Sequence, residues 1–378
     1  MPPSDDRLAW AALTRTPGLS VPALSTALET LGGAAGILGA ADSSRERAGL
    51  PPGAREFLRS AAAVPTEAER RWFDAPGHEL LAFDDPRFPR RLRAIGDCPI
   101  AIYVDGGVDL LDEPQLAIVG SRNPTAQGRE TAFAFAKYLA RQGLGITSGL
   151  AAGIDTQAHR GALAAGGATI AVLGSGPDVI YPTHNSVLAA EIARRGALVS
   201  EFAPGAPARR AHFPQRNRLI AALTLGTLVV EAARRSGSLI TARLAGEYGR
   251  EVFAIPGSIH NPLARGCHQL IRQGAKLTEN AEDVLGELDF SGVFATNPAA
   301  AAAATASVGE APGMDNDHKI LLDALGFDPA DIDTLVARTG FKADAVSSMM
   351  LILELEGHVQ AAPGGRYCRL VRSQWGER

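Results

Sequence analysis

Between about residue 78 and residue 290, short apolar runs alternate with stretches that have the spacing of amphipathic helices. Six of these runs are rich in Val, Ile and Leu, and they cover residues 116–120, 145–149, 170–174, 198–202, 228–232 and 252–257. A nearly continuous apolar run is typical of a strand that is covered on both faces, and helical crossovers indicate parallel pairing. The pattern predicts a doubly wound α/β domain with a parallel sheet. In such sheets ligands bind beyond the carboxyl ends of the strands, so functional residues are expected directly after the runs.

The chain of 378 residues is too long for one ordinary core, so two or three domains are expected. Residues 1–75 predict a small unit of helices joined by Pro-Gly turns, which suits protein docking better than binding of a nucleic-acid backbone. The α/β core should occupy residues 78–290, and an Ala- and Pro-rich linker should occupy residues 295–313. Residues 314–378 predict three helices and a hairpin that turns at Gly364-Gly365, which is a winged-helix pattern.

Arginines gather in one part of a chain whose net charge is −4. Residues 202–246 contain seven arginines and a single acid, Glu231. Several loops that follow the apolar runs are rich in Gly and Ser, and three of them contain Gly120-Ser121-Arg122, Ser148-Gly149 and Ser236-Gly237-Ser238. Arginines and backbone N–H groups at helix starts both attract phosphate. We therefore expect an anion-binding edge on the sheet, and the aromatic Phe213 among the arginines suits single-stranded nucleic acid.

Catalytic and cofactor motifs are weak by comparison. The sequence has no P-loop, HExxH, CxxC or GxSxG motif, and Gly174–Val179 imitates a dinucleotide turn without its third glycine. Asp155 and His159 lie one helical turn apart, but an acid near a helix start is favourable without any chemistry, and no third metal ligand is evident. We therefore expect a binding protein rather than an enzyme, with no catalytic residue, cofactor or metal.

The remaining composition favours the cytoplasm. The three cysteines are far apart, which is typical of a reducing compartment. No apolar run reaches the roughly 18 residues of a membrane span, and the N-terminal sequence shows no secretory signal. We therefore expect a cytoplasmic protein that has no membrane partner.

The ordered motifs of the core resemble those of the DNA-processing protein A family, known as DprA or Smf. The matching stretches are GSR at 120–122, SGLAAGIDTQAHRGAL at 148–163, GSGPDVIYP at 174–182, FPQRNRLIAAL at 213–223, VVEAARRSGSLITA at 229–242 and AIPGSIHNPLARGCHQLIRQGA at 254–275. The resemblance implies an extended Rossmann core that binds single-stranded DNA and forms a homodimer. It also implies that the protein protects incoming DNA in natural transformation and homologous recombination and helps to load the RecA recombinase. The implied flanking domains are a sterile-alpha-motif-like or helix-hairpin-helix-like N-terminus and a C-terminal winged helix.

The resemblance also implies a set of DNA contacts. Carried over onto this sequence, with the loops beside them, the candidates are Ser121, Arg122, Gly149, Arg210, Phe213, Arg216, Asn217, Ser236, Gly237 and Ser238. Arg210 and Arg216 would grip phosphates, and Phe213 would stack on a base or belong to the core. Asn217 would bond a loop or a nucleotide.

Three residues near these motifs carry further expectations. Arg218 is either a DNA contact or a structural partner of Glu201 or Glu231. Two positions depart from the family pattern, with His268 where Asn is expected and Ser175 where Thr is common.

Two other functions compete with single-strand binding. Related sheets carry nucleotide or phosphoribosyl hydrolases, whose loop reads PGGxGTxxE, but the corresponding stretch here is EAARRSGSL and lacks that glutamate. A duplex-DNA regulator needs a basic recognition helix. Residues 315–360 contain nine acids and three bases, so the C-terminal unit is expected to bind protein or to regulate the core.

Overall fold

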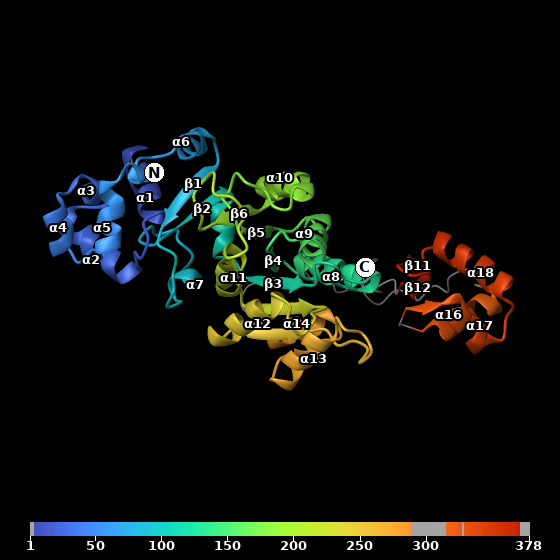
Figure 1. Ribbon diagram of the computed structural model, residues 1–378. Helices are drawn as coiled ribbons and strands as arrows, with labels where there is room; N and C mark the ends of the chain where they lie inside the picture. Colours follow the sequence, from blue (N-terminus) through green and yellow to red (C-terminus); the bar gives the residue numbers. More distant parts are fainter. Residues whose placement is uncertain (1–3, 289–314, 327–328, 371–378) are drawn as a thin grey trace, which may run out of the picture.

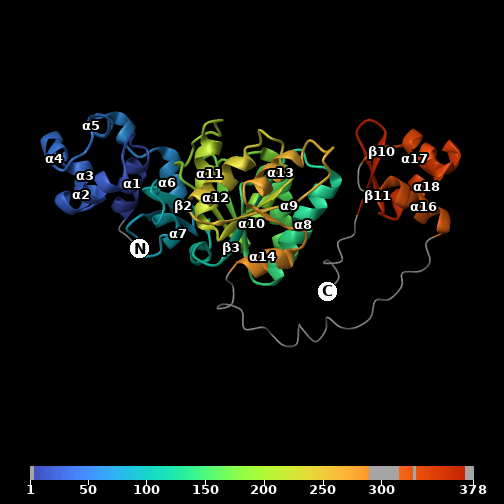
Figure 2. The ribbon, with the colours of Figure 1, turned by 90° about the horizontal axis from the view of Figure 1, so that it is seen from below.

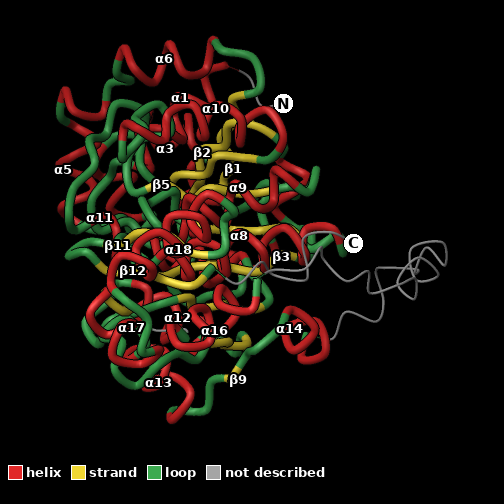
Figure 3. Tube along the Cα trace, turned by 90° about the vertical axis from the view of Figure 1, so that its right-hand side faces the viewer, coloured by secondary structure: helices red, strands yellow, loops and turns green. Residues whose placement is uncertain are grey.

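The computed structural model describes residues 4–288, 315–326 and 329–370, and these include a nine-stranded mixed sheet. Figure 3 shows the strands following one another from β1 and β2 to β9. In spatial order the strands are β1 (His78–Ala82), β2 (Ala101–Gly106), β6 (Ala197–Ser200), β5 (Thr169–Leu173), β4 (Gly145–Ser148), β3 (Gln115–Gly120), β7 (Gly226–Val230), β8 (Glu251–Ala254) and β9 (Lys276–Leu277). The six predicted strands are confirmed and pair in parallel.

The edge formed by β1 and β2 differs from the prediction of a wholly parallel sheet. Strand β2 runs antiparallel to β6, and β1 runs antiparallel to β2. These strands precede the alternating pattern of strands and helices, so no crossover helix forces them to be parallel. The fold remains a mostly parallel, doubly wound sheet with an antiparallel extension.

Strand β3 lies at the point where the strand order reverses. Its Ala117 pairs in parallel register with Thr147 of β4 on one side and Thr227 of β7 on the other. The chain passes from β3 through β4 and β5 to β6 in one direction, and then continues from β7 to β9 in the other. Ligands of doubly wound sheets bind in the crevice at such a reversal, beyond the carboxyl ends of the strands.

Both faces of the sheet are covered, which explains why the predicted strands are continuously apolar. Leu116 and Ile118 of β3 pack into one core, and Ala117 and Val119 pack into the other. The first face carries α8 (Ala126–Arg141), α9 (Ile154–Ala164), α10 (Ser186–Arg195) and α14 (Ala281–Glu287). The second face carries α7 (Arg90–Arg93), α11 (His212–Leu223), α12 (Ser238–Glu247) and α13 (Arg265–Arg272).

The N-terminal segment is helical, as predicted, and lies beyond the β1–β2 edge of the sheet (Figures 1 and 2). Its helices are α1 (Ser4–Thr14), α2 (Val21–Leu31), α3 (Ala34–Gly39), α4 (Asp42–Arg47), α5 (Pro52–Arg59) and α6 (Glu67–Asp74). Short 3-10 helices are η1 (Ala61–Ala63), η2 (Val108–Leu111) and η3 (Thr183–Asn185). The helical core includes Trp10 and Leu24 together with Leu80 of β1 and Tyr103 of β2. The helices therefore share their core with the outer strands rather than closing on themselves.

The C-terminal unit contains the three predicted helices and the predicted hairpin. Its elements are α16 (Asn316–Leu325), β10 (Ala330–Asp331), α17 (Ile332–Thr339), α18 (Ala343–Leu355), β11 (Val359–Ala362) and β12 (Arg366–Arg369). The hairpin turns at Gly364 and Gly365, whose φ angles are 83° and 69°, values that favour glycine. Leu321, Leu335 and Met350 form the centre of its own core. The predicted linker at 295–313 lies outside the described residues.

Among the described helices, none is both long and apolar enough to cross a bilayer.

Candidate nucleic-acid interface

A groove of about 680 Å³ lies at the reversal point of the sheet. Five segments that are distant in sequence line it: the loop after β3, the loop leading into α9, the loop after β5 that contains Tyr181, the start of α11 and the loop before α12. Of the ten predicted site residues, eight line the groove: Arg122, Arg210, Phe213, Arg216, Asn217, Ser236, Gly237 and Ser238. The other two, Ser121 and Gly149, lie beside residues that line it. The structure therefore assembles the sequence-predicted residues at one place.

The loop after β3 is held close to its neighbours. A Cβ atom on Gly120 would lie 1.9 Å from the carbonyl oxygen of Val230, so this position has no room for a side chain. The Ser121 hydroxyl accepts a hydrogen bond from the N–H of Asn123, and its carbonyl accepts one from the N–H of Ile154. These contacts fix the loop, while the Arg122 side chain projects from it and is exposed.

The start of α8 does not serve as the predicted anion site, because a carboxylate of the protein already occupies it. Glu231 accepts hydrogen bonds from the N–H of Thr125 at 2.8 Å and from its hydroxyl at 2.5 Å. Thr125 in turn caps the helix by accepting from the N–H of Gly128. The attraction that this helix end has for negative charge is therefore used internally, and Arg122 is the exposed cationic side chain of the loop.

Phe213 forms an aromatic wall of the groove and is only half-buried. The Arg122 guanidinium carbon lies 5.4 Å from the centre of the Phe213 ring, within cation–π range. The Tyr181 ring lies 5.7 Å from the same ring, tilted by 50°, and Tyr181 is 51% exposed. Phe213 packs against Gly174, where an added Cβ would lie 3.0 Å from the ring. Tyr181 was missed as a site residue, although the GSGPDVIYP motif contains it.

Arg216 lies differently from the expectation that its guanidinium grips a phosphate. The residue is 3% exposed, and its guanidinium donates hydrogen bonds to the carbonyl oxygens of Gly149, at 2.7 Å, and Val172. Burial lowers the pKa of Arg216 to about 10, and nearby Asp155 opposes that shift. The side chain is therefore a charged internal brace, which joins α11 to β5 and to the loop after β4.

Asp155 and His159 both have roles inside the fold. The Asp155 carboxylate accepts from the N–H groups of Gly149 at 3.0 Å and Ala151 at 3.3 Å. Burial raises the pKa of Asp155, and Arg216 opposes the rise. His159 is fully buried with Nδ1 2.8 Å from the Thr169 hydroxyl, and burial lowers its pKa to about 3. The hydrogen bonds thus support structural roles for Asp155 and His159, whose spacing also suits an acid and a base.

Metal-binding side chains do not gather in the part of the chain that the structure describes. No group of three or more His, Cys, Asp or Glu residues there has a geometry that could hold an ion.

The loop before α12 is ordered by its own hydroxyl groups. The Ser236 and Ser238 Oγ atoms are 2.6 Å apart, and the N–H of Ser238 donates to Ser236 Oγ at 3.3 Å. The Asn217 side-chain amide donates to the carbonyl oxygen of Gly237 at 3.3 Å. Asn217 therefore ties α11 to this loop, which is one of its two predicted roles.

The arginines near the start of α11 separate into two kinds. Arg218 forms ion pairs with Glu201 and with Asp97, so the predicted pairing with Glu201 is confirmed, while Glu231 bonds to Thr125 instead. Arg210 is exposed on the groove. Among the described residues neither Arg122 nor Arg210 forms an ion pair. Their charges are therefore available to a ligand.

The two departures from the family pattern fall outside the groove lining. His268 Nε2 lies 2.9 Å from the carbonyl oxygen of Gly257, so it fastens the loop before α13. The Ser175 hydroxyl donates to the carbonyl oxygen of Val179 and is buried. Neither change alters the charge or the aromatic surface of the groove.

Comparison with known proteins agrees with the motifs. Residues 79–289 match the family model of DNA recombination-mediator protein A, and residues 297–365 match the DprA winged helix domain. The chain is 42% identical to protein Smf of Escherichia coli over 85% of this chain and 84% of that protein. It is 48% identical to DNA processing protein DprA of Streptococcus pneumoniae over 54% of this chain and 73% of that protein.

Two solved structures are also similar. The crystal structure of DprA from Streptococcus pneumoniae has a TM-score of 0.64 at 38% identity and covers 77% of this chain and 100% of its own. DNA processing protein A from Helicobacter pylori, whose structure was described for its single-stranded DNA binding mode, has a TM-score of 0.50 at 32% identity, and the match covers 55% of this chain and 94% of that one. With both family models matched in order along one chain, the protein belongs to the DNA recombination-mediator protein A family, the family of DprA and Smf.

Proposed function

We propose that the groove binds single-stranded DNA and that the protein acts as a binder rather than as an enzyme. The observation that carries this proposal is the combination of Arg122, Phe213 and Tyr181 on one groove, where the Arg122 guanidinium and the Tyr181 ring each lie within 6 Å of the Phe213 ring. Arginine for phosphates and accessible rings for bases are what sequence-independent single-strand binding needs. The related protein from Helicobacter pylori, described for its single-stranded DNA binding, supports the same ligand.

Some groove residues contact the phosphates of the strand, and others contact its bases. Arg122 and Arg210 are exposed and contact phosphates, while Phe213 and Tyr181 stack on bases. Ser236, Gly237 and Ser238 line the same groove and supply hydroxyl and backbone groups. A duplex keeps its bases paired and stacked, so it cannot use the rings, and single strands are preferred.

Arg216 supports DNA binding from beneath the groove surface. Its charge is buried beneath Phe213, 6.0 Å from the ring centre, and raises the positive potential of the groove without a direct phosphate contact. It also holds the loop at Gly149 against β5.

The cellular role that fits this activity is that of a recombination mediator. The family membership supports a cytoplasmic homodimer that protects incoming single strands and helps to load the RecA recombinase in natural transformation and homologous recombination. Each of these steps needs a protein that holds a single strand through its backbone without reading its sequence.

The winged-helix unit serves a protein partner or regulates the core rather than reading duplex DNA. Its α18 exposes Leu351, Ile352 and Leu355 and carries Glu354, and Glu356 follows directly after the helix. Apolar side chains among carboxylates suit a protein surface, whereas a helix in a DNA groove needs basic side chains.

Binding of a labelled dT20 oligonucleotide and of a 20-base-pair duplex, followed by fluorescence anisotropy in moderate salt, tests the proposal. We expect the single strand to bind at least tenfold more tightly than the duplex. Equal or tighter binding of the duplex would reject the single-strand groove, and turnover of a nucleotide or phosphoribosyl substrate would reject the non-enzymatic role.

A further inference from the structure

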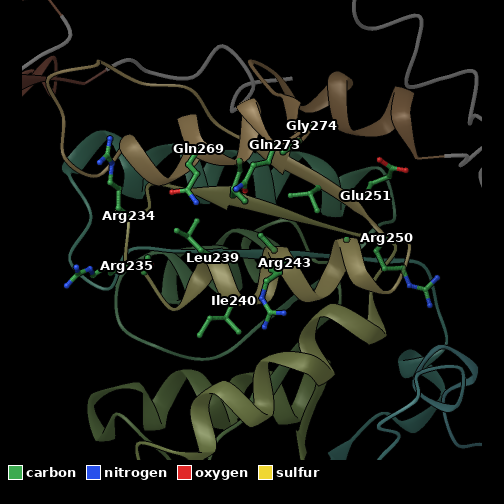
Figure 4. Close-up of a pocket in the computed structure, with 16 residues that line it drawn as sticks. Arg234, Arg235, Leu239, Ile240, Arg243, Arg250, Glu251, Gln269, Gln273 and Gly274 are labelled. Atoms are coloured by element: carbon green, nitrogen blue, oxygen red, sulfur yellow. The ribbon is translucent and has the colours of Figure 1, made fainter.

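A second basic cleft lies between α12 and α13 and has a volume of about 760 Å³. Figure 4 shows Leu239, Ile240 and Arg243 on α12, Gln269 on α13 and Gln273 just after it, all of which line the cleft. The predicted DNA contacts include none of its arginines, although Arg234 and Arg235 lie in the matching stretch at 229–242. The residues that line the cleft indicate which kind of ligand it could bind.

Four arginines line this cleft: Arg234, Arg235, Arg243 and Arg250. Glu251 is the sole carboxylate among the lining residues. Arg243 is paired with Glu247 on its own helix, and that side chain is still 62% exposed. The Nε atom of Arg250 is buried without a hydrogen-bond partner in the described part of the chain. The excess of positive charge favours an anionic ligand.

The floor of the cleft is apolar, which favours an anionic ligand that also has an apolar surface. Ala242 and Leu270 are buried at the floor, and Leu239 and Val252 are partly exposed beside them. Gln269 and Gln273 add amide groups that both donate and accept hydrogen bonds. An apolar floor, amides at the side and guanidinium groups around them match a nucleotide, which has a flat base and a phosphate.

The cleft is continuous with the first groove. Arg235, Ser236 and Ile240 line both of them, so the two hollows meet across the first turn of α12. A strand that leaves the groove past Ser236 therefore enters a surface whose charge matches its backbone. We propose that the cleft between α12 and α13 binds the nucleotides that follow those held in the groove, and thereby lengthens the DNA site. This inference rests on the proposed single-strand binding by the groove.

The test compares two lengths of DNA on variants of residues that line the cleft alone. The cleft variant is Arg234→Ala/Arg243→Ala, and the matched control is Arg160→Ala/Arg194→Ala, whose exposed arginines belong to α9 and α10 on the opposite face. We expect the cleft variant to bind dT20 at least fivefold more weakly than the wild type. Its salt slope should fall by about 1.4, since each single-strand phosphate contact contributes about 0.7. Its affinity for dT5 should change less than twofold, and the control should match the wild type on both.

The remaining outcomes distinguish failure of the groove proposal from failure of the cleft proposal. Failure of the wild type to bind dT20 would reject the proposed groove function itself. Normal dT20 binding by the cleft variant, or an equal loss on dT5 and dT20, would overturn the extended site and leave the groove in place. Calorimetric titration with free dAMP tests whether the cleft binds a free nucleotide instead of a DNA strand. Binding of dAMP that the cleft variant loses, with dT20 affinity unchanged, would assign the cleft to a free nucleotide and also overturn the proposal.

Discussion

The guanidinium of Arg216 lies directly against the backbone of Gly149, donating to its carbonyl oxygen at 2.7 Å. A Cβ atom added to Gly149 would lie 2.4 Å from Arg216 Nη1, a distance that no side chain tolerates. The contact fixes the loop after β4 and the start of α11 at the same time. Because Arg216 is charged and buried, the surrounding fold is sensitive to any movement of it.

Replacement of Gly149 by alanine should therefore destabilise the core. We expect Gly149→Ala to lower the free energy of unfolding by about 1–3 kcal/mol, the usual range for overpacking a filled site. Gly246→Ala on α12 is the matched control, because nothing lies within 4 Å of an added Cβ there and alanine favours a helix. Urea unfolding of the two variants checks this, and equal stability of both would contradict the packing of Arg216 on Gly149.

His159 should make the stability of the core depend on pH. The folded protein lowers the pKa of His159 from its ordinary 6.5 to about 3 because the ring is buried. Stability is then complete above the unfolded value and is lost as the pH falls from about 6.5 toward 3, by up to about 1.4 kcal/mol per pH unit. Urea unfolding at a series of pH values should show a flatter profile for His159→Asn than for the wild type.

The control for this profile is His184→Asn, since His184 is exposed. We expect it to follow the wild-type profile. An unchanged slope in His159→Asn would show that other groups cause the acid sensitivity.

Arg218 should behave as a structural residue, unlike the exposed arginines of the groove. Burial raises the pKa of Glu201, and Arg218 opposes that rise, so removal of the arginine leaves a carboxylate in a mostly buried place. We expect Arg218→Ala to lower the free energy of unfolding by roughly 2–3 kcal/mol, because an unpaired, partly buried charge is costly.

A double variant that removes both charges of the ion pair checks this role of Arg218. In Arg218→Met/Glu201→Gln, at least half of the loss in the free energy of unfolding seen for Arg218→Ala should be recovered. Binding of dT20 by folded Arg218→Ala should stay within twofold of the wild type. A large loss of DNA affinity without loss of stability would instead place Arg218 among the DNA contacts.

Phe213 should contribute a ring to DNA binding. Loss of a stacked base costs about 1–3 kcal/mol, so we expect Phe213→Leu to weaken dT20 binding by roughly 5- to 150-fold. Phe133→Leu is the matched control, because Phe133 is a partly exposed aromatic residue of α8 on the opposite face. Anisotropy titrations would argue against stacking if the two variants bound equally well.

The sequence predicts the six parallel strands and the clustering of the groove residues, because both follow from local patterns. A buried parallel strand has to be apolar, and residues after such strands have to meet at one edge of the sheet. The inward turn of Arg216 was missed, although a signal exists: Arg216, Leu219, Ile220 and Leu223 recur at helical spacing and so share the buried face of α11. Charge alone does not tell a buried arginine from an exposed one.

Other parts of the site depend on contacts between distant segments. Glu231 caps α8 through Thr125, which is 106 positions away in the sequence. Tyr181 reaches Phe213 from a different loop, and no periodicity links the two. The antiparallel addition of β1 and β2 follows from the whole sheet rather than from either segment.

Arg122 tests the central claim most directly, because it is the exposed charge nearest to the aromatic wall. Anisotropy titrations of labelled dT20 across a salt series should compare the wild type, Arg122→Ala and the control Arg160→Ala, with thermal melts to confirm that all three are folded. We expect Arg122→Ala to bind at least tenfold more weakly, with a salt slope smaller by about 0.7, as expected for one lost phosphate contact on a single strand. Arg160→Ala should match the wild type. Unchanged affinity and slope in Arg122→Ala would contradict the account and move the DNA away from this groove.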